Sequence, residues 1–120
     1  MKLEDQVCSL ELAKKLKELG VKQDSYYCWN LYIPSGVSKL ESYPATNVHY
    51  WQTFSAFTVA ELGEILPPFV TTEKYLCKGK PRFNAHEEET IECHSWHDDK
   101  EANARAKMLI HLIEQGIVKP

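Results

Sequence analysis

Apolar residues recur at helical spacing in the C-terminal part of the chain, between Asp98 and Gly116. They lie three or four positions apart, as on one face of an α-helix, and polar residues occupy the opposite face. The apolar face consists of Ala102, Ala106, Leu109, Ile110 and Ile113, and the polar face of Lys100, Asn103, Lys107, His111 and Glu114. Asp98 is a suitable N-cap, Glu101 three positions later completes a capping box, and Gly116 can end the helix. We therefore expect a helix that buries one side against a sheet.

Two shorter stretches carry the same helical signals. Ser9 is a candidate N-cap for a helix with a leucine stripe that ends at Gly20. Thr58, followed three positions later by Glu61, predicts a second helix that begins with a capping box. Gly63 lies inside this second helix, where glycine costs about 1 kcal/mol relative to alanine. Such a cost indicates a place where another group packs closely against the helix.

Strand signals lie between these helices. Residues 26–33 are dense in aromatic and branched side chains, and a short strand over residues 48–54 is the expected partner. Residues 73–78, 82–88 and 90–96 indicate two or three antiparallel strands with a turn around Gly79 and Pro81. Residues 34–47 are rich in proline, serine and glycine, which predicts a long loop or an insertion.

The order helix, strands, helix, strands, helix favours an α+β fold, because a doubly wound parallel sheet needs regular alternation of strands and helices. We expect one globular domain over residues 1–120. Its three helices should pack on a mostly antiparallel sheet of about four or five strands. A chain of this length buries roughly two-thirds of its unfolded surface, so the fold needs no disulfide or metal to hold it together.

Composition is that of an ordinary globular protein, with 43% hydrophobic and 26% charged residues. The formal net charge is −3, and the lysines are scattered along polar helix faces. Neither feature supports binding to a phosphate backbone. A nucleic-acid-binding alternative remains, because the helix that ends at Gly20 could begin a helix-turn-helix, although strand signals follow it where a recognition helix is required.

Cysteine usage and the N-terminal residues indicate a cytoplasmic protein. Residues 1–10 contain no apolar core of a signal peptide, and no window approaches the length of a membrane span. Four cysteines, Cys8, Cys28, Cys77 and Cys93, occur without a CxxC pair. We interpret them as reduced thiols that serve mainly in packing.

Three stretches resemble parts of known sequences: VCSLELA at residues 7–13 continuing through VKQ at 21–23, SAFTVAELGE at 55–64, and residues 102–114. The group they resemble consists of small uncharacterised phage and prophage proteins of unknown function. The resemblance covers about half of the chain and falls on the predicted helices and their caps. It implies a mobile-element origin, and it assigns no activity, cofactor or catalytic residue.

A histidine-rich segment is the candidate metal site. His94, His97 and Cys93 offer nitrogen and sulfur ligands of the kind that zinc takes in tetrahedral sites. His86, Cys77 and Asp98 lie near enough in sequence to add ligands. Against this hypothesis, no CxxC or HExxH spacing defines a site, and a strand places Cys93 and His94 on opposite faces. The alternative interpretation is a polar strand end that leads into the C-terminal helix.

Other arrangements of polar residues give little support for an enzyme. His97 and Asp98 could form a hydrolytic pair, but Asp98 is already expected to cap a helix. The acidic residues Glu87, Glu88, Glu89 and Glu92 are interpreted as a solvated strand edge that discourages aggregation. The sequence contains no glycine-rich phosphate loop and no GxSxG motif.

Aromatic residues around the predicted loop are the candidate interaction surface. Tyr43, Tyr50 and Trp51 lie in or beside residues 34–47, and aromatic residues are enriched at contact hot spots. The alternative is that these rings simply cover the sheet. The function that the sequence favours is a small non-enzymatic phage or prophage accessory protein that binds a host or phage protein. A zinc-binding or nuclease-like protein and a nucleic-acid-binding protein are the alternatives.

Overall fold

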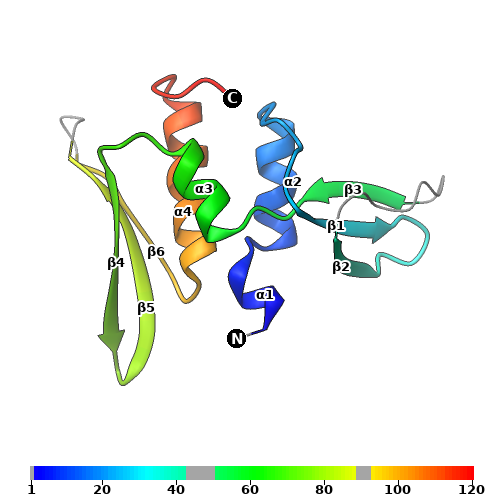
Figure 1. The fold of residues 1–120 in the computed structure, drawn as a ribbon, viewed down its shortest axis with the longest axis horizontal. Coiled ribbons are helices and arrows are strands. Elements are labelled where there is room, and N and C mark those ends of the chain that lie inside the picture. Colours follow the sequence, from blue (N-terminus) through cyan, green and yellow to red (C-terminus); the bar gives the residue numbers. More distant parts are fainter. Residues whose placement is uncertain (1, 43–50, 89–92) are drawn as a thin grey trace.

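The computed structural model describes residues 2–42, 51–88 and 93–120. Within these residues the chain forms helices at both ends and in the middle, with strands between them (Figure 1). The elements are α1 (Leu3–Gln6), α2 (Leu10–Glu18), β1 (Tyr27–Tyr32), β2 (Ser38–Ser42), β3 (Trp51–Ser55), α3 (Val59–Ile65), β4 (Val70–Cys77), β5 (Lys80–Glu87), β6 (Ser95–Asp98) and α4 (Glu101–Glu114). No helix in these ranges has the length and apolar character needed to cross a membrane.

The strands form two separate antiparallel sheets, with strand orders β2-β1-β3 and β4-β5-β6. Figure 1 shows the two sheets on opposite sides of a helical layer. Helix α2 contacts β3 of the first sheet, whereas α4 contacts β5 and β6 of the second. The α+β class is confirmed, but the expectation of one sheet of four or five strands was only partly correct. The described residues also contain four helices where three were expected, because the one-turn helix α1 has neither a side-chain cap nor an apolar stripe to indicate it. The helices lie between the sheets, so each sheet packs one face on them.

Strand β2 lies inside the segment that was predicted to be a loop. It pairs with β1, with Tyr27 opposite Ser42 and Leu31 opposite Ser38. Gly36 in the connecting turn has a positive φ of 73°, which glycine adopts without strain. The loop prediction was therefore wrong for residues 38–42, because strand pairing formed where the local composition favoured turns. Strand β3 pairs with β1 as predicted, whereas residues 43–50 lie outside the described part of the chain.

Helix α4 is buried on more sides than its sequence pattern predicts. The expected apolar face is buried or partly buried, and Ala104, Met108 and Leu112 are also fully buried. The reason is that α4 contacts α1, α2 and α3 as well as β5 and β6. Asn103, predicted on the polar face, is 9% exposed; its Oδ1 accepts a hydrogen bond of 2.8 Å from the backbone N–H of Ser9. The C-terminal helix is thus the centre of the molecule.

The start of α4 differs from the predicted capping box. Asp98 is the last residue of β6, where it pairs with Phe83, and the N-cap position belongs to Lys100, whose side chain makes no capping bond. The Asp98 carboxylate instead accepts hydrogen bonds from the Lys100 backbone N–H at 3.0 Å and from Lys107 Nζ at 2.7 Å. Pairing with β5 keeps Asp98 extended, so its side chain connects strand to helix without capping the helix.

The two other predicted helix starts are confirmed. Ser9 Oγ accepts a hydrogen bond of 3.4 Å from the N–H of Leu12 at the start of α2. Thr58 and Glu61 form the reciprocal capping box of α3, with distances of 3.1 and 3.0 Å. Gly63 in α3 leaves room for a neighbouring side chain, since a Cβ atom there would lie 2.3 Å from Arg105 Nη1. The unfavourable glycine therefore allows α3 and α4 to approach each other.

Candidate functional site

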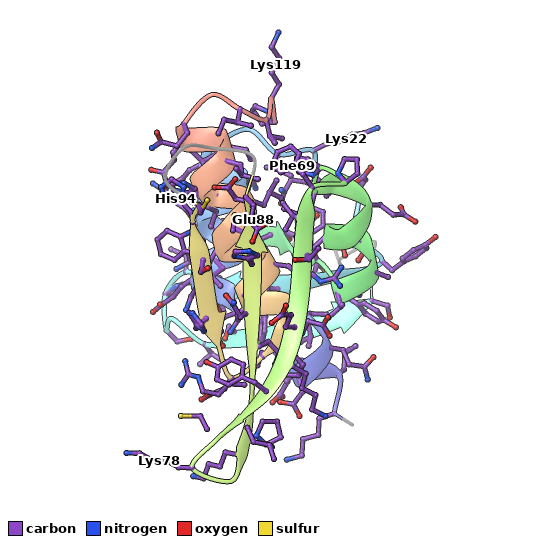
Figure 2. The ribbon with its side chains drawn as sticks, turned by 90° about the vertical axis from the view of Figure 1, so that its left-hand side faces the viewer. Lys22, Phe69, Lys78, Glu88, His94 and Lys119 are labelled. Atoms are coloured by element: carbon purple, nitrogen blue, oxygen red, sulfur yellow. The ribbon has the colours of Figure 1, made fainter. Side chains whose placement is uncertain are left out.

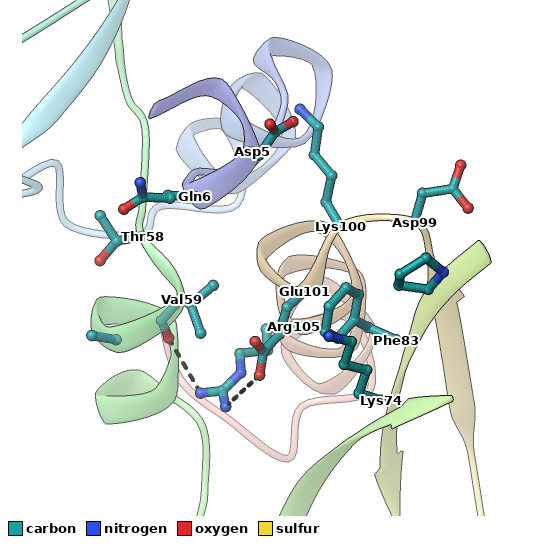
Figure 3. A pocket seen from close by; sticks show the side chains of 12 residues that line it. Asp5, Gln6, Thr58, Val59, Lys74, Phe83, Asp99, Lys100, Glu101 and Arg105 are labelled. Atoms are coloured by element: carbon teal, nitrogen blue, oxygen red, sulfur yellow. Dashed lines mark hydrogen bonds and ion pairs between the residues drawn. The ribbon is translucent and has the colours of Figure 1, made fainter. Parts of the chain in front are cut away.

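A groove of about 680 Å³ lies beside the β4–β5 hairpin, between that hairpin, α1 and the first turns of α3 and α4 (Figure 3). It is lined by Asp5, Gln6, Thr58, Val59, Ala60, Lys74, Pro81, Phe83, Asp99, Lys100, Glu101 and Arg105. The apolar part of the lining comes from two walls, Val59 and Ala60 on α3 and Pro81 and Phe83 on β5. A concave surface with an apolar lining and a few charged groups is typical of a binding site.

The groove exists because the hairpin reaches beyond the helix that supports its sheet. Helix α4 packs on β5 and β6, which leaves β4 as the edge strand on the side of α3. The last five residues of β4, 73–77, are all exposed. Lys78 and Gly79 form a two-residue turn with φ values of 52° and 77°, and this turn sets the register of the hairpin. The open strand and α3 thus form facing walls.

Arg105 fixes the floor of the groove. Its Nη1 donates a hydrogen bond of 3.2 Å to the carbonyl oxygen of Val59, and its Nη2 lies 3.1 Å from Glu101 Oε1 (Figure 3). The guanidinium therefore joins the first turn of α3 to the first turn of α4. Because Gly63 has no side chain, nothing displaces this group. We infer that the floor is held in one arrangement before any ligand binds.

Charged groups at the rim differ in whether the protein already neutralises them. Asp99 forms an ion pair of 3.1 Å with Arg82, and Lys100 Nζ donates a hydrogen bond of 2.8 Å to the carbonyl oxygen of Glu4. Lys74 and Asp5, on opposite walls, have no ion-pair partner among the residues that the structure describes. These two side chains are the charges that a ligand in the groove can meet.

The predicted metal ligands do not converge in one site. His94 contacts His111 of α4, with 4.1 Å between ring centroids, and therefore lies on the helix side of the sheet. His97 lies on the other face, where its Nδ1 is 2.9 Å from Tyr75 Oη. Cys93 is exposed at a positive φ of 50°. Within residues 2–42, 51–88 and 93–120, no group of three or more histidine, cysteine or acidic side chains could hold a metal ion.

Glu87 lies where the sequence analysis did not expect it. Instead of belonging to a solvated edge it is fully buried, because it alternates with Phe83 and Ala85 on the face of β5 that meets α4. Its Oε1 accepts a hydrogen bond of 3.0 Å from the His94 backbone N–H and lies 3.0 Å from His94 Nδ1. The contact with Glu87 orients the His94 imidazole. His94 lies at the end of the sheet opposite Lys78 (Figure 2). Glu88, the next residue, is exposed and contacts His86 at 2.9 Å.

The predicted interaction aromatics fall largely outside the described residues. This holds for Tyr43 and Tyr50, and for Trp51 the structure gives the backbone, paired opposite Tyr32 at the start of β3. The expected surface around them therefore stays a prediction. The structure contradicts the helix-turn-helix hypothesis, because α2 is followed by strand β1 where a recognition helix would be required.

Sequence reasoning missed the groove because five elements, α1, α3, β4, β5 and α4, supply its lining. The only signal was Gly63, whose cost in a helix indicated close packing at the place where Arg105 now lies. Comparisons of the chain with protein-family models, with curated proteins and with solved structures found no match in any of the three.

Proposed function

We propose that this protein acts without catalysis, by binding another protein in the groove between the β4–β5 hairpin and α3. The observation that carries the proposal is the groove itself, with apolar walls and a floor fixed by Arg105. A preformed apolar cleft binds a partner at low entropic cost, because few of its side chains must become ordered. Lys74 and Asp5 add charges that can select among partners.

The resemblance to small phage and prophage proteins supports a more specific form of this proposal. The protein would be an accessory protein of a mobile element, and its partner a host or phage protein in the cytoplasm. A zinc-binding or nuclease-like role has less support, since His94 and His97 contact groups on opposite faces of the sheet. Binding of nucleic acid also has less support, because the formal net charge is −3.

Substitution of Ala60 tests the proposed function. Ala60 is exposed and lines the groove, so Ala60→Lys places a long charged side chain in the groove without disturbing the core. We expect this variant to capture its partner from host lysate at least about tenfold less than the wild type, as for loss of a contact hot spot. Quantitative mass spectrometry of proteins retained by the immobilised full chain measures the difference.

Glu64→Gln is the matched control for this experiment. Glu64 is exposed on the same helix, does not line the groove, and its substitution changes the net charge by the same single unit. Glu64→Gln should retain the partner at the level of the wild type. If Ala60→Lys retained every captured protein equally well, the groove would not be the binding site.

A further inference from the structure

We propose that the partner enters the groove as an extended peptide that pairs with the free edge of β4 and carries an acidic side chain opposite Lys74. This inference rests on the proposed function and specifies the form of its ligand. Strand addition to an exposed sheet edge combines main-chain hydrogen bonds with side-chain contacts at every second residue. Both components are available along β4.

The edge of β4 offers main-chain donors and acceptors. Figure 2 shows β4 along one edge of its sheet, between Phe69 and Lys78. In a hairpin with a two-residue turn, the two residues that flank the turn form a hydrogen-bonded pair, and here these are Cys77 and Lys80. Hydrogen-bonded pairs then alternate with non-hydrogen-bonded pairs along the two strands. The N–H and C=O groups of the alternate β4 residues therefore point away from β5. These residues are Thr72, Lys74 and Leu76.

The same alternate residues direct their side chains toward the groove. Lys74 is opposite Phe83 and Leu76 is opposite Pro81, and both of these β5 residues line the groove. Leu76 is 71% exposed, which is unusual for a large aliphatic side chain on the helix side of a sheet. A peptide paired with β4 would lie between this strand and Ala60 on α3. It would cover Leu76 and place alternate side chains against the apolar walls.

The charge of Lys74 favours an acidic residue at the peptide position opposite it. Lys74 lies within the exposed part of β4 and has no carboxylate partner among the described residues. Opposite charges on directly paired residues of neighbouring strands stabilise the pairing. A glutamate or aspartate opposite Lys74 would supply the missing charge.

A second copy of this chain fits the edge less well. Two-fold antiparallel pairing of β4 with itself must keep residues of one face opposite each other. The two registers that pair most of the strand set Glu73 opposite Glu73 or Lys74 opposite Lys74. Like charges in directly opposite positions destabilise antiparallel pairing. The strand thus disfavours self-association while remaining open to a different acidic strand.

A displayed library of random ten-residue peptides, selected on the immobilised full chain, supplies the probe. Enriched peptides should carry branched or aromatic residues at every second position, with at least one acidic residue in this same set so that it faces Lys74, and Ala60→Lys should not bind them. The decisive measurement is fluorescence anisotropy of one selected peptide in which each backbone amide is N-methylated in turn. Strand addition predicts a period of two, with alternate methylations weakening binding by about fivefold or more and those between having little effect.

Lys74→Gln should weaken binding of the selected peptide by about fivefold, as for loss of an exposed ion pair. The matched control is Glu73→Gln, whose side chain lies on the opposite face of the strand and which should bind like the wild type.

The possible failures are distinguishable. If the peptide binds the wild type but not Ala60→Lys, and N-methylation has no periodic effect, the groove remains the binding site and strand addition is overturned. If no selected peptide distinguishes Ala60→Lys from the wild type, both proposals fail. A concentration-dependent dimer of the chain that Lys74→Gln strengthens would also overturn the proposal, because a second copy would then occupy the edge.

Discussion

Single side chains hold distant segments of this molecule together, and Glu61 does so through one carboxylate. Beyond its bonds in the capping box of α3, its Oε1 lies 2.8 Å from Ser25 Oγ, and its Oε2 accepts a hydrogen bond of 3.2 Å from the Tyr26 backbone N–H. Ser25 is only 2% exposed. The capping signal in the sequence identified Glu61 correctly, but not its second role of attaching α3 to the segment before β1.

We expect Glu61→Ala to lower the free energy of unfolding by about 2 kcal/mol, since it removes a helix cap and leaves Ser25 and Tyr26 without their carboxylate acceptor. Chemical denaturation followed by circular dichroism measures this change. Glu64→Ala, on the exposed side of the same helix, is the control and should change stability by less than about 0.5 kcal/mol. Equal effects of the two substitutions would show that the Glu61 bonds contribute nothing to stability.

The four cysteines separate into two pairs by burial. Cys8 and Cys28 are fully buried, as their interpretation as packing residues requires, whereas Cys77 and Cys93 are exposed, so that interpretation was wrong for them. Burial raises the pKa of the Cys8 thiol to about 11, so almost none of it is thiolate at neutral pH. Burial, together with the charge of Glu41, also raises the pKa of Cys28.

An aromatic disulfide reagent should therefore modify two thiols of the folded chain rapidly and the other two only after addition of denaturant. The double variant Cys77→Ser, Cys93→Ser should lose the rapid phase and keep the slow one. Release of the coloured thiolate, followed by absorbance, gives both counts. Rapid modification of all four thiols without denaturant would contradict the buried positions of Cys8 and Cys28.

At the scale of elements, the junction between β6 and α4 depends on the charge of Asp98. Burial by itself raises the pKa of this carboxyl, but hydrogen bonds from Lys107, the Lys100 N–H and Asn103 outweigh burial and hold the pKa below its usual value of 3.8. The unfolded chain consequently takes up a proton at higher pH than the folded chain does. The stabilisation by Asp98 is complete above the unfolded pKa and is lost as the pH falls through the folded one.

Asp98→Asn should cost about 2 kcal/mol of stability at neutral pH, and this difference from the wild type should shrink as the pH falls below about 4. Urea denaturation of both proteins at a series of pH values measures the difference. The exposed neighbour Asp99 provides a control, since Asp99→Asn removes only a surface ion pair with Arg82. A difference that did not depend on pH would mean that the carboxylate charge does not stabilise the junction.

At the scale of the whole molecule, two three-stranded sheets enclose a helical layer in which α4 is central (Figure 1). The second sheet extends past α4 toward α3, and the groove lies between the β4–β5 hairpin of this sheet and helix α3. The tests at Ala60 and along the edge of β4 both depend on this arrangement. It places an exposed strand edge beside an apolar groove, which is the geometry required for binding an extended peptide.

The sequence by itself determined the local structure. The positions of α2, α3 and α4, the caps at Ser9 and Thr58 and the hairpin turn at Gly79 were predicted, because they depend on residues close in sequence or on simple periodicity, whereas the short helix α1 was not predicted. The pairing of β3 with β1 was predicted from the strand signals of both segments. The tertiary structure decided the features that the pattern of apolar and polar residues does not specify. Strand β2 formed through pairing, Asp98 was drawn into β6, Glu87 was buried by alternation with Ala85, and five elements met around Arg105 to form the groove. The groove and the positions of Asp98 and Glu87 depend on contacts between elements that are separated in the chain, and β2 depends on hairpin pairing that its own composition does not favour. Local propensity contains no information about such contacts.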